Sequence, residues 1–219
     1  MRTAILASQN RNKIKELSAI FRKYGFEVIA RDDAGLPPDD IEETGKTFEE
    51  NSKLKARVIL DMIRKDPAFE KYLDSPVIAD DSGLMVDALG GAPGVFSARY
   101  AGEGCTYADN NVKLLAALKG VPKEKRGAGF VTVITMLFPE GTEAVPAAVQ
   151  DGDVSVLMAR GELRGRIAEE TRGSEGFGYD PVFIPEGYGN TFAELGTAFK
   201  NTISHRARAI EELERLLDQ

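Results

Sequence analysis

Residues 3–30 read TAILASQNRNKIKELSAIFRKYGFEVIA, and this stretch decides the fold class. A short β-type run over 3–7 ends in a polar break, after which apolar residues recur at helical spacing from Ile14 to Tyr24. Gly25 then supplies a left-handed stop before a second β-type run over 26–30. The order strand, helix, strand is typical of a parallel crossover, so the stretch predicts an α/β protein whose sheet carries helices on its faces.

A second helix is predicted downstream from its start signal. Thr47 and Glu50 form a capping box, and an apolar stripe with helical spacing follows over residues 54–62. Asn51 falls on the same stripe one turn earlier, where a helix of the core would carry an aliphatic residue. We therefore expect Asn51 to face something polar.

The other elements are predicted more coarsely. In chain order they are a loop over 32–46, a surface excursion over 65–75, a strand over 76–79, a helix over 109–118, a long strand over 130–138, an antiparallel meander over 144–149 and 154–159, and C-terminal helices after a second capping box at residues 191–194. A length of 219 residues, without internal repeats, predicts one large domain or two tightly joined lobes over 1–219.

The composition excludes several classes of function. With 28 bases, 35 acids and no lysine-rich run, the chain has a formal charge of −7, which argues against nucleic acid or an anionic membrane as partner. Cys105 is the one cysteine and His205 the one histidine, so an internal disulfide and a Cys/His zinc cage are excluded, and any metal must sit on carboxylates. No segment reaches about 18 apolar residues, and a reducing cytoplasm is the expected location.

The first candidate site lies where the first strand meets the first helix. Ser8 and Asn10 precede the helix, whose free N–H groups can bind an anion, and Lys13 adds a positive charge one turn inside. An ordinary N-cap is the competing interpretation of the same residues.

Carboxylates form the second candidate site. Asp80, Asp81 and Ser82 directly follow a buried strand, at the position where α/β sheets carry their sites. Adjacent residues on extended backbone point to opposite sides, so at most one aspartate enters a given pocket. That aspartate could bind Mg²⁺ or activate water, or the pair could simply form a turn. Glu42 or Glu43 could supply a second carboxylate, unless both belong to a solvated acidic loop.

Two features near the C-terminus complete the candidates. Phe177 stands between two glycines, and a large ring there could stack on a nucleobase or plug the core. His205 and Arg206 follow Ser204 at a predicted helix start, which separates them from an ordinary surface histidine and its neighbour.

Taken together, these blocks resemble the inosine triphosphate pyrophosphatase family in order and spacing. The matching blocks are Ala7-Ser8-Gln9-Asn10 with Lys13, Phe48 through Lys55, Ile78 through Leu84, Gly90 through Gly94, Gly176 through Pro181, and Ser204-His205-Arg206. The resemblance implies an elongated α/β fold of two lobes, with a long central mixed sheet, flanking helices and a nucleotide cleft between the lobes. It also implies a cytoplasmic homodimer that uses Mg²⁺ to hydrolyse non-standard purine nucleoside triphosphates (ITP, dITP, XTP) to the monophosphate and pyrophosphate, which cleanses the nucleotide pool.

The resemblance also implies a role for each matching residue. Asp81 would activate water and bind metal, and Glu42 or Glu43 would be a second metal ligand. Ser8, Asn10 and Lys13 would bind the triphosphate, Arg99 would be a further phosphate contact, and Ser82 would contact substrate. Phe177 would stack on the purine, with Gly178, Tyr179 and Asp180 around it. Lys200, His205 and Arg206 would contact the base and its 6-oxo group.

Two departures from the family pattern stand out, and two other functions compete. The family usually has Thr-Gly-Asn where this chain has Ser8-Gln9-Asn10, and the stretch over 65–75 is longer than usual.

A pyrophosphatase for modified pyrimidine nucleotides is one alternative function, which the donors for a 6-oxo group disfavour. A module that binds nucleotides without cleaving them is the other, if Gln9 disables the phosphate loop.

Overall fold

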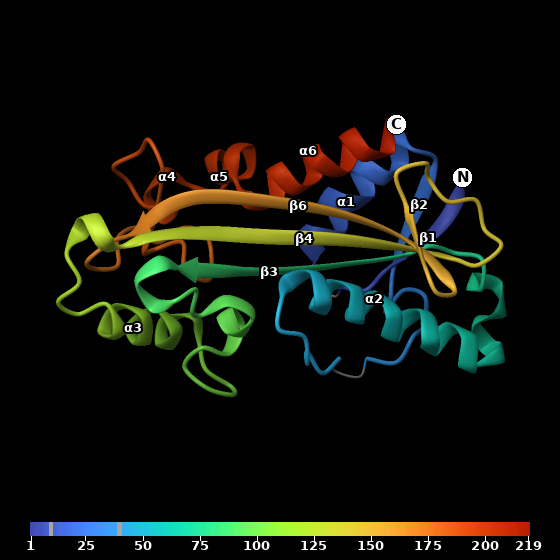
Figure 1. The fold of residues 1–219 in the computed structure, drawn as a ribbon, viewed down its shortest axis with the longest axis horizontal. Helices are drawn as coiled ribbons and strands as arrows, with labels where there is room; N and C mark the ends of the chain where they lie inside the picture. Colours follow the sequence, from blue (N-terminus) through green and yellow to red (C-terminus); the bar gives the residue numbers. More distant parts are fainter. Residues whose placement is uncertain (9–10, 39–40) are drawn as a thin grey trace. The chain divides into compact units, whose positions relative to one another are not determined.

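The computed structural model describes residues 1–8, 11–38 and 41–219, and it has the predicted α/β class (Figure 1). The strands are β1 (Arg2–Leu6), β2 (Phe26–Ala30), β3 (Val77–Val86), β4 (Gly127–Pro139), β5 (Val149–Asp151), β6 (Val154–Ile167) and β7 (Phe183–Pro185). The α-helices are α1 (Arg11–Lys23), α2 (Phe48–Lys65), α3 (Tyr107–Ala117), α4 (Phe192–Leu195), α5 (Thr197–Ile203) and α6 (His205–Leu217). Short 3₁₀ helices are η1 (Pro67–Tyr72), η2 (Asp87–Leu89), η3 (Gly94–Arg99) and η4 (Lys123–Lys125).

The sheet is mixed, as predicted. Its strand order is β2-β1-β3-β4-β6-β5, and β7 pairs with β6 outside this path. β1 is parallel to both of its neighbours, with Leu6 opposite Ala30 of β2 and Ile78 of β3. β6 is antiparallel to β5 and β7. The parallel crossover predicted from residues 3–30 is therefore confirmed.

The contacts divide the chain into two compact units. Unit 1 comprises Met1–Asp81, Val133–Arg160 and Ile210–Gln219, and unit 2 comprises Ser82–Thr132 and Gly161–Ala209. Strands β3, β4 and β6 each contribute one end to unit 1 and the other end to unit 2. Each unit has its own hydrophobic core.

In unit 1, helices cover both faces of the sheet. Figure 1 shows α1 and the C-terminal part of α6 on one face, and α2 on the other. The core under α2 joins Ile59 and Leu60 to Ile5 and Val77, all of them fully buried. On the opposite face, Lys23 at the end of α1 forms an ion pair of 2.8 Å with Glu214 of α6.

In unit 2, aromatic rings form the centre of the core. Phe183 packs against Phe130 and Phe192, with ring centroids 4.6 Å and 5.4 Å apart. Gly161 in β6 lets the first turn of α6 approach closely, because a Cβ at this position would collide with the backbone oxygen of His205. The sheet thereby fixes the start of α6, where the histidine stands.

Local sequence signals placed several helix starts correctly. The capping boxes at Thr47 and Thr191 are both present, and Gly25 has the left-handed φ of 80° that ends α1. A third box at Thr106 and Asp109 begins α3 earlier than the predicted 109–118. The sequence argument missed it because it sought Glu or Gln at the third helical position.

Three predicted segments were wrong in detail. β3 does not end at 79 but continues to Val86, so Asp80 and Asp81 lie within a strand rather than after one. The polar residues interrupt the apolar pattern, although Leu84 and Val86 resume it and are fully buried. The stretch over 65–75 is not wholly a surface excursion, because Tyr72 is buried in the core of unit 1. The meander consists of β5 and the much longer β6, with no strand over 144–148.

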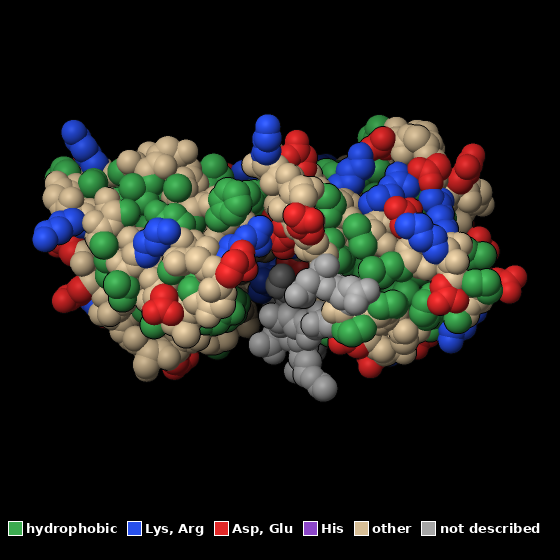
Figure 2. Space-filling view, turned by 90° about the horizontal axis from the view of Figure 1, so that it is seen from below, with side chains coloured by type: hydrophobic (Ala, Val, Ile, Leu, Met, Phe, Trp, Pro, Cys, Tyr) green, Lys and Arg blue, Asp and Glu red, His purple; other side chains and the backbone are tan. Residues whose placement is uncertain are grey.

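The surface carries both signs of charge. Figure 2 shows basic and acidic side chains interspersed on the face that it views, with hydrophobic side chains between them. Among the described residues, no helix has both the length and the apolar content that crossing a membrane requires.

Candidate functional site

A cluster of two carboxylates and one lysine forms the candidate site of unit 1. Helix α2 carries Lys55, whose Nζ lies 2.7 Å from Oδ1 of Asp81 in β3 and 2.6 Å from Oε1 of Glu43. The three side chains are largely buried, with exposed fractions of 17% for Lys55, 8% for Asp81 and 21% for Glu43. One ammonium thus holds two carboxylates together in a poorly solvated place.

Burial and charge act in opposite directions on this cluster. Burial raises the pKa of Asp81 above its usual value, and the nearby Lys55 ammonium only partly offsets this. Burial alone would lower the pKa of Lys55, but attraction to Asp81 and Glu43 outweighs it and the pKa is raised. Both groups therefore bind a proton more tightly than usual: Lys55 stays an ammonium, and the Asp81 carboxylate is more basic than an ordinary aspartate.

The two oxygens of Asp81 have different surroundings. Oδ1 accepts the hydrogen bond of Lys55, whereas Oδ2 is buried and has no hydrogen-bond partner within the described ranges. A buried carboxylate oxygen without a donor is costly, and such groups commonly mark a place for a ligand or an ion. Asp81 can therefore accept a proton or coordinate a cation at Oδ2 while Lys55 fixes its orientation.

The first two turns of α2 hold the loop that carries Glu43. Oδ1 of Asn51 accepts a hydrogen bond of 2.8 Å from the backbone N–H of Gly45. Oε2 of Glu50 accepts from the N–H groups of Lys46 and Thr47 at 2.6 Å and 3.2 Å. Asn51 is fully buried, so the expectation that it faces something polar is confirmed. Its side chain ties the loop to the helix that also presents Lys55.

The other predicted residues of unit 1 are less connected to this cluster. Of the two glutamates left open by the sequence, Glu43 contacts Lys55, whereas Glu42 is exposed. Ser8 is half-buried and is the second residue after β1, before α1 begins at Arg11. Asn10 lies outside the described residues, as does the side chain of Lys13.

In unit 2, a glycine-rich loop presents an aromatic ring. Gly176 and Gly178 both have positive φ, and the Phe177 ring between them is 47% exposed. Such exposure rules out the plug into the core. Lys200 of α5 places its ammonium 4.3 Å from the centre of this ring, and the Tyr107 ring lies 6.2 Å from it. The ring therefore remains available for stacking on its solvent-facing side.

A buried ion pair fixes the conformation of this loop. Nζ of Lys200 donates to both carboxylate oxygens of Asp180 at 2.7 Å, and Oδ2 also accepts from the N–H of Phe177 at 3.0 Å. Asp180 is 1% exposed and Lys200 6% exposed. Because a Cβ at Gly176 would collide with Oδ2 of Asp180, glycine is required there. Lys200 was predicted to contact the base. In the structure its ion pair with Asp180 positions Phe177.

Two further hydrogen bonds, from Tyr179 and from Asn111, fix the same loop. The hydroxyl of Tyr179 donates to the backbone oxygen of Ser97 at 2.8 Å, and burial raises the pKa of Tyr179 above its usual value. Nδ2 of Asn111 in α3 donates to the backbone oxygen of Gly178 at 2.9 Å. Tyr179 is therefore a supporting residue with a buried ring, and it presents no exposed face as Phe177 does.

The remaining predicted residues of unit 2 occupy three separate places. His205 begins α6, and its buried ring stacks on Phe130 with centroids 4.7 Å apart, while Arg206 follows in the same turn. Ser82 Oγ lies 2.8 Å from Oγ1 of Thr132. Arg99 ends η3, with its guanidinium 5.6 Å from the Phe96 ring.

Sequence reasoning gave no role to Lys55 or Asn111. The signal for Lys55 was present, since it lies four residues after Asn51 on the polar part of the α2 stripe. Asn111 had no such signal, because its partner is a backbone carbonyl 67 residues away.

Comparisons with known proteins identify the family of this chain. The model of the Ham1 family matches residues 4–216. A protein of Caldanaerobacter subterraneus subsp. tengcongensis, called dITP/XTP pyrophosphatase, is 44% identical over 97% of this chain and 94% of its own length. Its counterpart of the same description in Haemophilus influenzae is 46% identical over 97% of each chain.

Solved structures give the same result. A HAM1 protein from Coxiella burnetii superimposes with a TM-score of 0.82 at 38% identity, covering 100% of this chain and 99% of the other. A nucleoside-triphosphatase and dITP/XTP pyrophosphatase from Mycobacterium abscessus has a TM-score of 0.75 at 36% identity, covering 96% and 98%. Because the family match spans almost every described element and both side-chain clusters, this chain belongs to the Ham1 family.

Proposed function

We propose that this protein hydrolyses non-standard purine nucleoside triphosphates (ITP, dITP and XTP) to the monophosphate and pyrophosphate. Membership of the Ham1 family and relatives named dITP/XTP pyrophosphatase support the reaction class. The observation that carries the proposal for this chain is the Asp81 carboxylate, whose Oδ1 is held by Lys55 while the buried Oδ2 has no partner in the described part of the chain.

In this reaction, Asp81 acts as the general base. A water molecule attacks the α-phosphorus in line with the bond to the bridging oxygen of the β-phosphate. Oδ2 of Asp81 accepts the proton of that water, a new P–O bond forms, and the bond to the pyrophosphate leaving group breaks. The raised pKa of Asp81 favours proton transfer, because a more basic carboxylate is a better acceptor.

The carboxylates also fit Mg²⁺. Within the described residues there is no group of three or more His, Cys, Asp or Glu side chains, so an all-protein cage is absent there. Mg²⁺ is usually held by one or two carboxylates together with water and substrate phosphates, and the carboxylates of Asp81 and Glu43 would supply such ligands. When bound, Mg²⁺ would neutralise charge on the triphosphate and on the leaving group.

Lys55 has two tasks in this proposal. Its ammonium holds Glu43 and Asp81 in one place despite their like charges. It also contributes positive charge beside a substrate that carries about four negative charges. Ser8, Asn10 and Lys13 at the start of α1 and Arg99 in η3 are proposed to bind phosphate groups.

The residues of unit 2 are proposed to select the base. Phe177 stacks on the purine, supported by Gly178, Tyr179, Asp180 and Lys200, while Ser82 contacts substrate. His205 and Arg206 donate hydrogen bonds to a 6-oxo group. A 6-amino group would leave those donors unpaired, at a cost of roughly 1–3 kcal/mol for each buried group, so ATP should be a poor substrate.

The proposal extends to assembly and location. We infer a cytoplasmic homodimer on the basis of the family resemblance, and we infer that nucleic acid and membranes are not partners because the chain has a formal charge of −7 and no lysine-rich run.

A direct assay tests the function. ITP and ATP are each incubated with the full-length protein and Mg²⁺, and pyrophosphate and orthophosphate are quantified. Release of pyrophosphate from ITP, with at least about tenfold slower release from ATP, is expected. The Asp81→Asn variant, which keeps the shape of the side chain, should lose activity by orders of magnitude with an unchanged circular dichroism spectrum. Comparable cleavage of ATP and ITP, or near-normal activity of Asp81→Asn, would contradict the proposal.

A further inference from the structure

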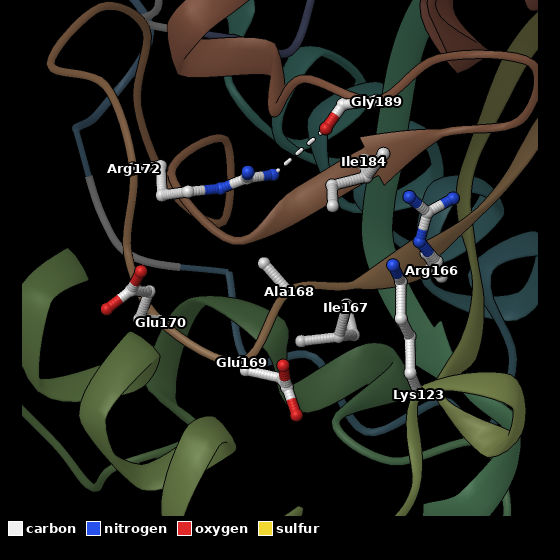
Figure 3. A pocket seen from close by; sticks show the side chains of 9 residues that line it. All are labelled: Lys123, Arg166, Ile167, Ala168, Glu169, Glu170, Arg172, Ile184 and Gly189. Atoms are coloured by element: carbon white, nitrogen blue, oxygen red, sulfur yellow. Dashed lines mark hydrogen bonds between the residues drawn. The ribbon is translucent and has the colours of Figure 1, made fainter.

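A cavity of about 140 Å³ lies in unit 2, and it shares no residue with the proposed reaction site (Figure 3). One wall is the ladder between β6 and β7, in which Arg166 is the register partner of Ile184. Lys123, the first residue of η4, closes one side, and Arg172, which follows β6, closes the other. The volume exceeds the roughly 30 Å³ share of one water molecule several times over, so a group the size of phosphate fits.

Positive charge gathers on one side of this cavity. Figure 3 shows the Lys123 ammonium beside the guanidinium of Arg166, while Arg172 reaches in from the opposite side towards Gly189. The carboxylates of Glu169 and Glu170 also belong to the lining, and that of Glu170 points away from Arg166. A chain with a formal charge of −7 thus directs three cations at one small cavity.

These cations have unused hydrogen-bonding capacity. Within residues 1–8, 11–38 and 41–219, neither the Lys123 ammonium nor the Arg166 guanidinium forms a hydrogen bond or an ion pair. Nε of Arg166 and Nε of Arg172 are both buried, and neither has an acceptor among the residues that the structure describes. A buried donor that lacks an acceptor costs free energy, and an oxyanion in the cavity would supply acceptors to both arginines.

The cavity is built on rigid elements. Arg172 is oriented by a hydrogen bond of 3.1 Å to the Gly189 oxygen and by an ion pair of 3.6 Å with Glu194. The buried Arg126 donates to the Ala168 oxygen at 2.9 Å, which fixes the chain directly after β6. Ile184 is 4% exposed and gives the cavity an apolar wall, which strengthens electrostatic attraction inside it. Arg172 and the chain directly after β6 are therefore held in place before any ligand arrives.

We propose that this cavity binds a phosphate-bearing small anion, with Arg166 and Lys123 as the principal ligands and Arg172 as the third. A planar guanidinium offers two parallel N–H groups to phosphate oxygens, and a neighbouring ammonium adds a point charge, a combination suited to a dianion. Inorganic phosphate, pyrophosphate and the phosphate group of a nucleoside monophosphate share this chemistry. The cavity is independent of the proposed reaction, since it stands on its own residues.

Arginine side-chain NMR tests this inference at the residues concerned. The Nε–Hε signals of Arg166 and Arg172 are assigned by their loss in R166Q and R172Q, and the full-length protein is titrated with inorganic phosphate, pyrophosphate or IMP in EDTA. Saturable shifts of both signals are expected with at least one of the three anions, and the ranking of the anions identifies the source of the phosphate. If no anion shifts these signals, the proposal is wrong.

Matched variants separate this site from general anion binding. R166Q should weaken binding at least about tenfold, and Arg166→Lys should have an intermediate effect because it keeps the charge but not the paired donors. Lys125→Gln, on the same exposed turn but outside the lining, should change the dissociation constant by less than about twofold. Glu169→Gln should tighten binding. Thermal unfolding curves check that R166Q and the wild type are both folded. Equal affinity of the two proteins for the anion would then overturn the assignment.

Discussion

Lys55 Nζ lies 2.7 Å from Oδ1 of Asp81, and the helix that carries the lysine also carries the groups that hold the loop of Glu43. One element, α2, thereby determines the positions of both carboxylates. Hydrogen bonds of the helix start hold the loop that carries Glu43, and Lys55 joins Glu43 to Asp81.

Replacing Lys55 should expose the repulsion between the two carboxylates. Lys55→Gln is expected to destabilise the protein by about 1–3 kcal/mol at pH 7, because it leaves two largely buried carboxylates without their cation. Part of this loss should be recovered at acidic pH, where protonation relieves the repulsion. Urea unfolding at pH 5 and pH 7 measures both effects.

Lys53→Gln is the control on the same helix, because the Lys53–Asp151 ion pair is exposed and contributes less than about 1 kcal/mol to stability. Equal stability of both variants at pH 7 would refute the role of Lys55.

Asn51 should act as a positioning residue for the Glu43 loop. Asn51→Ala removes the acceptor of the Gly45 N–H, and we expect the Mg²⁺ concentration that gives half-maximal activity to rise more than kcat falls. Binding of Mn²⁺ without substrate, followed by electron paramagnetic resonance, should weaken in parallel. Glu49→Gln, which disturbs only the surface pair with Arg160, is the matched control. A fall in kcat with unchanged metal dependence would argue for a merely structural role.

Removing the Phe177 ring should weaken substrate binding with little effect on folding. Base stacking on an aromatic ring contributes roughly 1–3 kcal/mol, so Phe177→Ala should raise KM for ITP by about 5- to 100-fold. Stability should change little, because the ring is 47% exposed. Tyr188→Ala removes a ring that is 40% exposed in the same unit and has no proposed role, and its KM should stay near that of the wild type. A normal KM for Phe177→Ala would exclude stacking at this position.

Tyr179 should make the protein sensitive to alkaline pH. Burial raises its pKa in the folded state, so its contribution to stability is complete below the unfolded pKa of about 10 and is lost as pH rises above that value. Between pH 8 and pH 10.5 the loss from this group should approach about 1 kcal/mol. Tyr179→Phe should be less stable at pH 8, because it lacks the hydrogen bond to Ser97, but should lose less stability over the same interval. Parallel pH profiles for both proteins in urea unfolding would contradict this account.

Local signals explain which parts of the fold could be predicted from the sequence. The helical spacing from Ile14 to Tyr24 and the capping box at Thr47 are properties of a few neighbouring residues, and both gave correct elements. The extent of β3 was missed because two adjacent aspartates, Asp80 and Asp81, are typical of a strand end. In the structure Asp81 stays within the strand because Lys55 neutralises its buried charge.

The candidate site was predictable to a similar degree. Asp81 and Phe177 were predicted from residue type and from the blocks that carry the family resemblance, and Lys200 was predicted as a base contact; their roles stay predictions. The pairing of Lys200 with Asp180 was not predicted, because it joins residues 20 apart through the packing of α5. Tertiary contacts of this kind leave no periodic trace in the sequence.

The position of water attack is the most direct test of the central claim that Asp81 activates water against the α-phosphorus. The protein hydrolyses ITP with Mg²⁺ in water enriched in ¹⁸O, and mass spectrometry locates the label in the products. The account predicts one ¹⁸O atom in IMP, none in pyrophosphate, and no measurable turnover by Asp81→Asn. Label in pyrophosphate or in orthophosphate, or full turnover by Asp81→Asn, would contradict it.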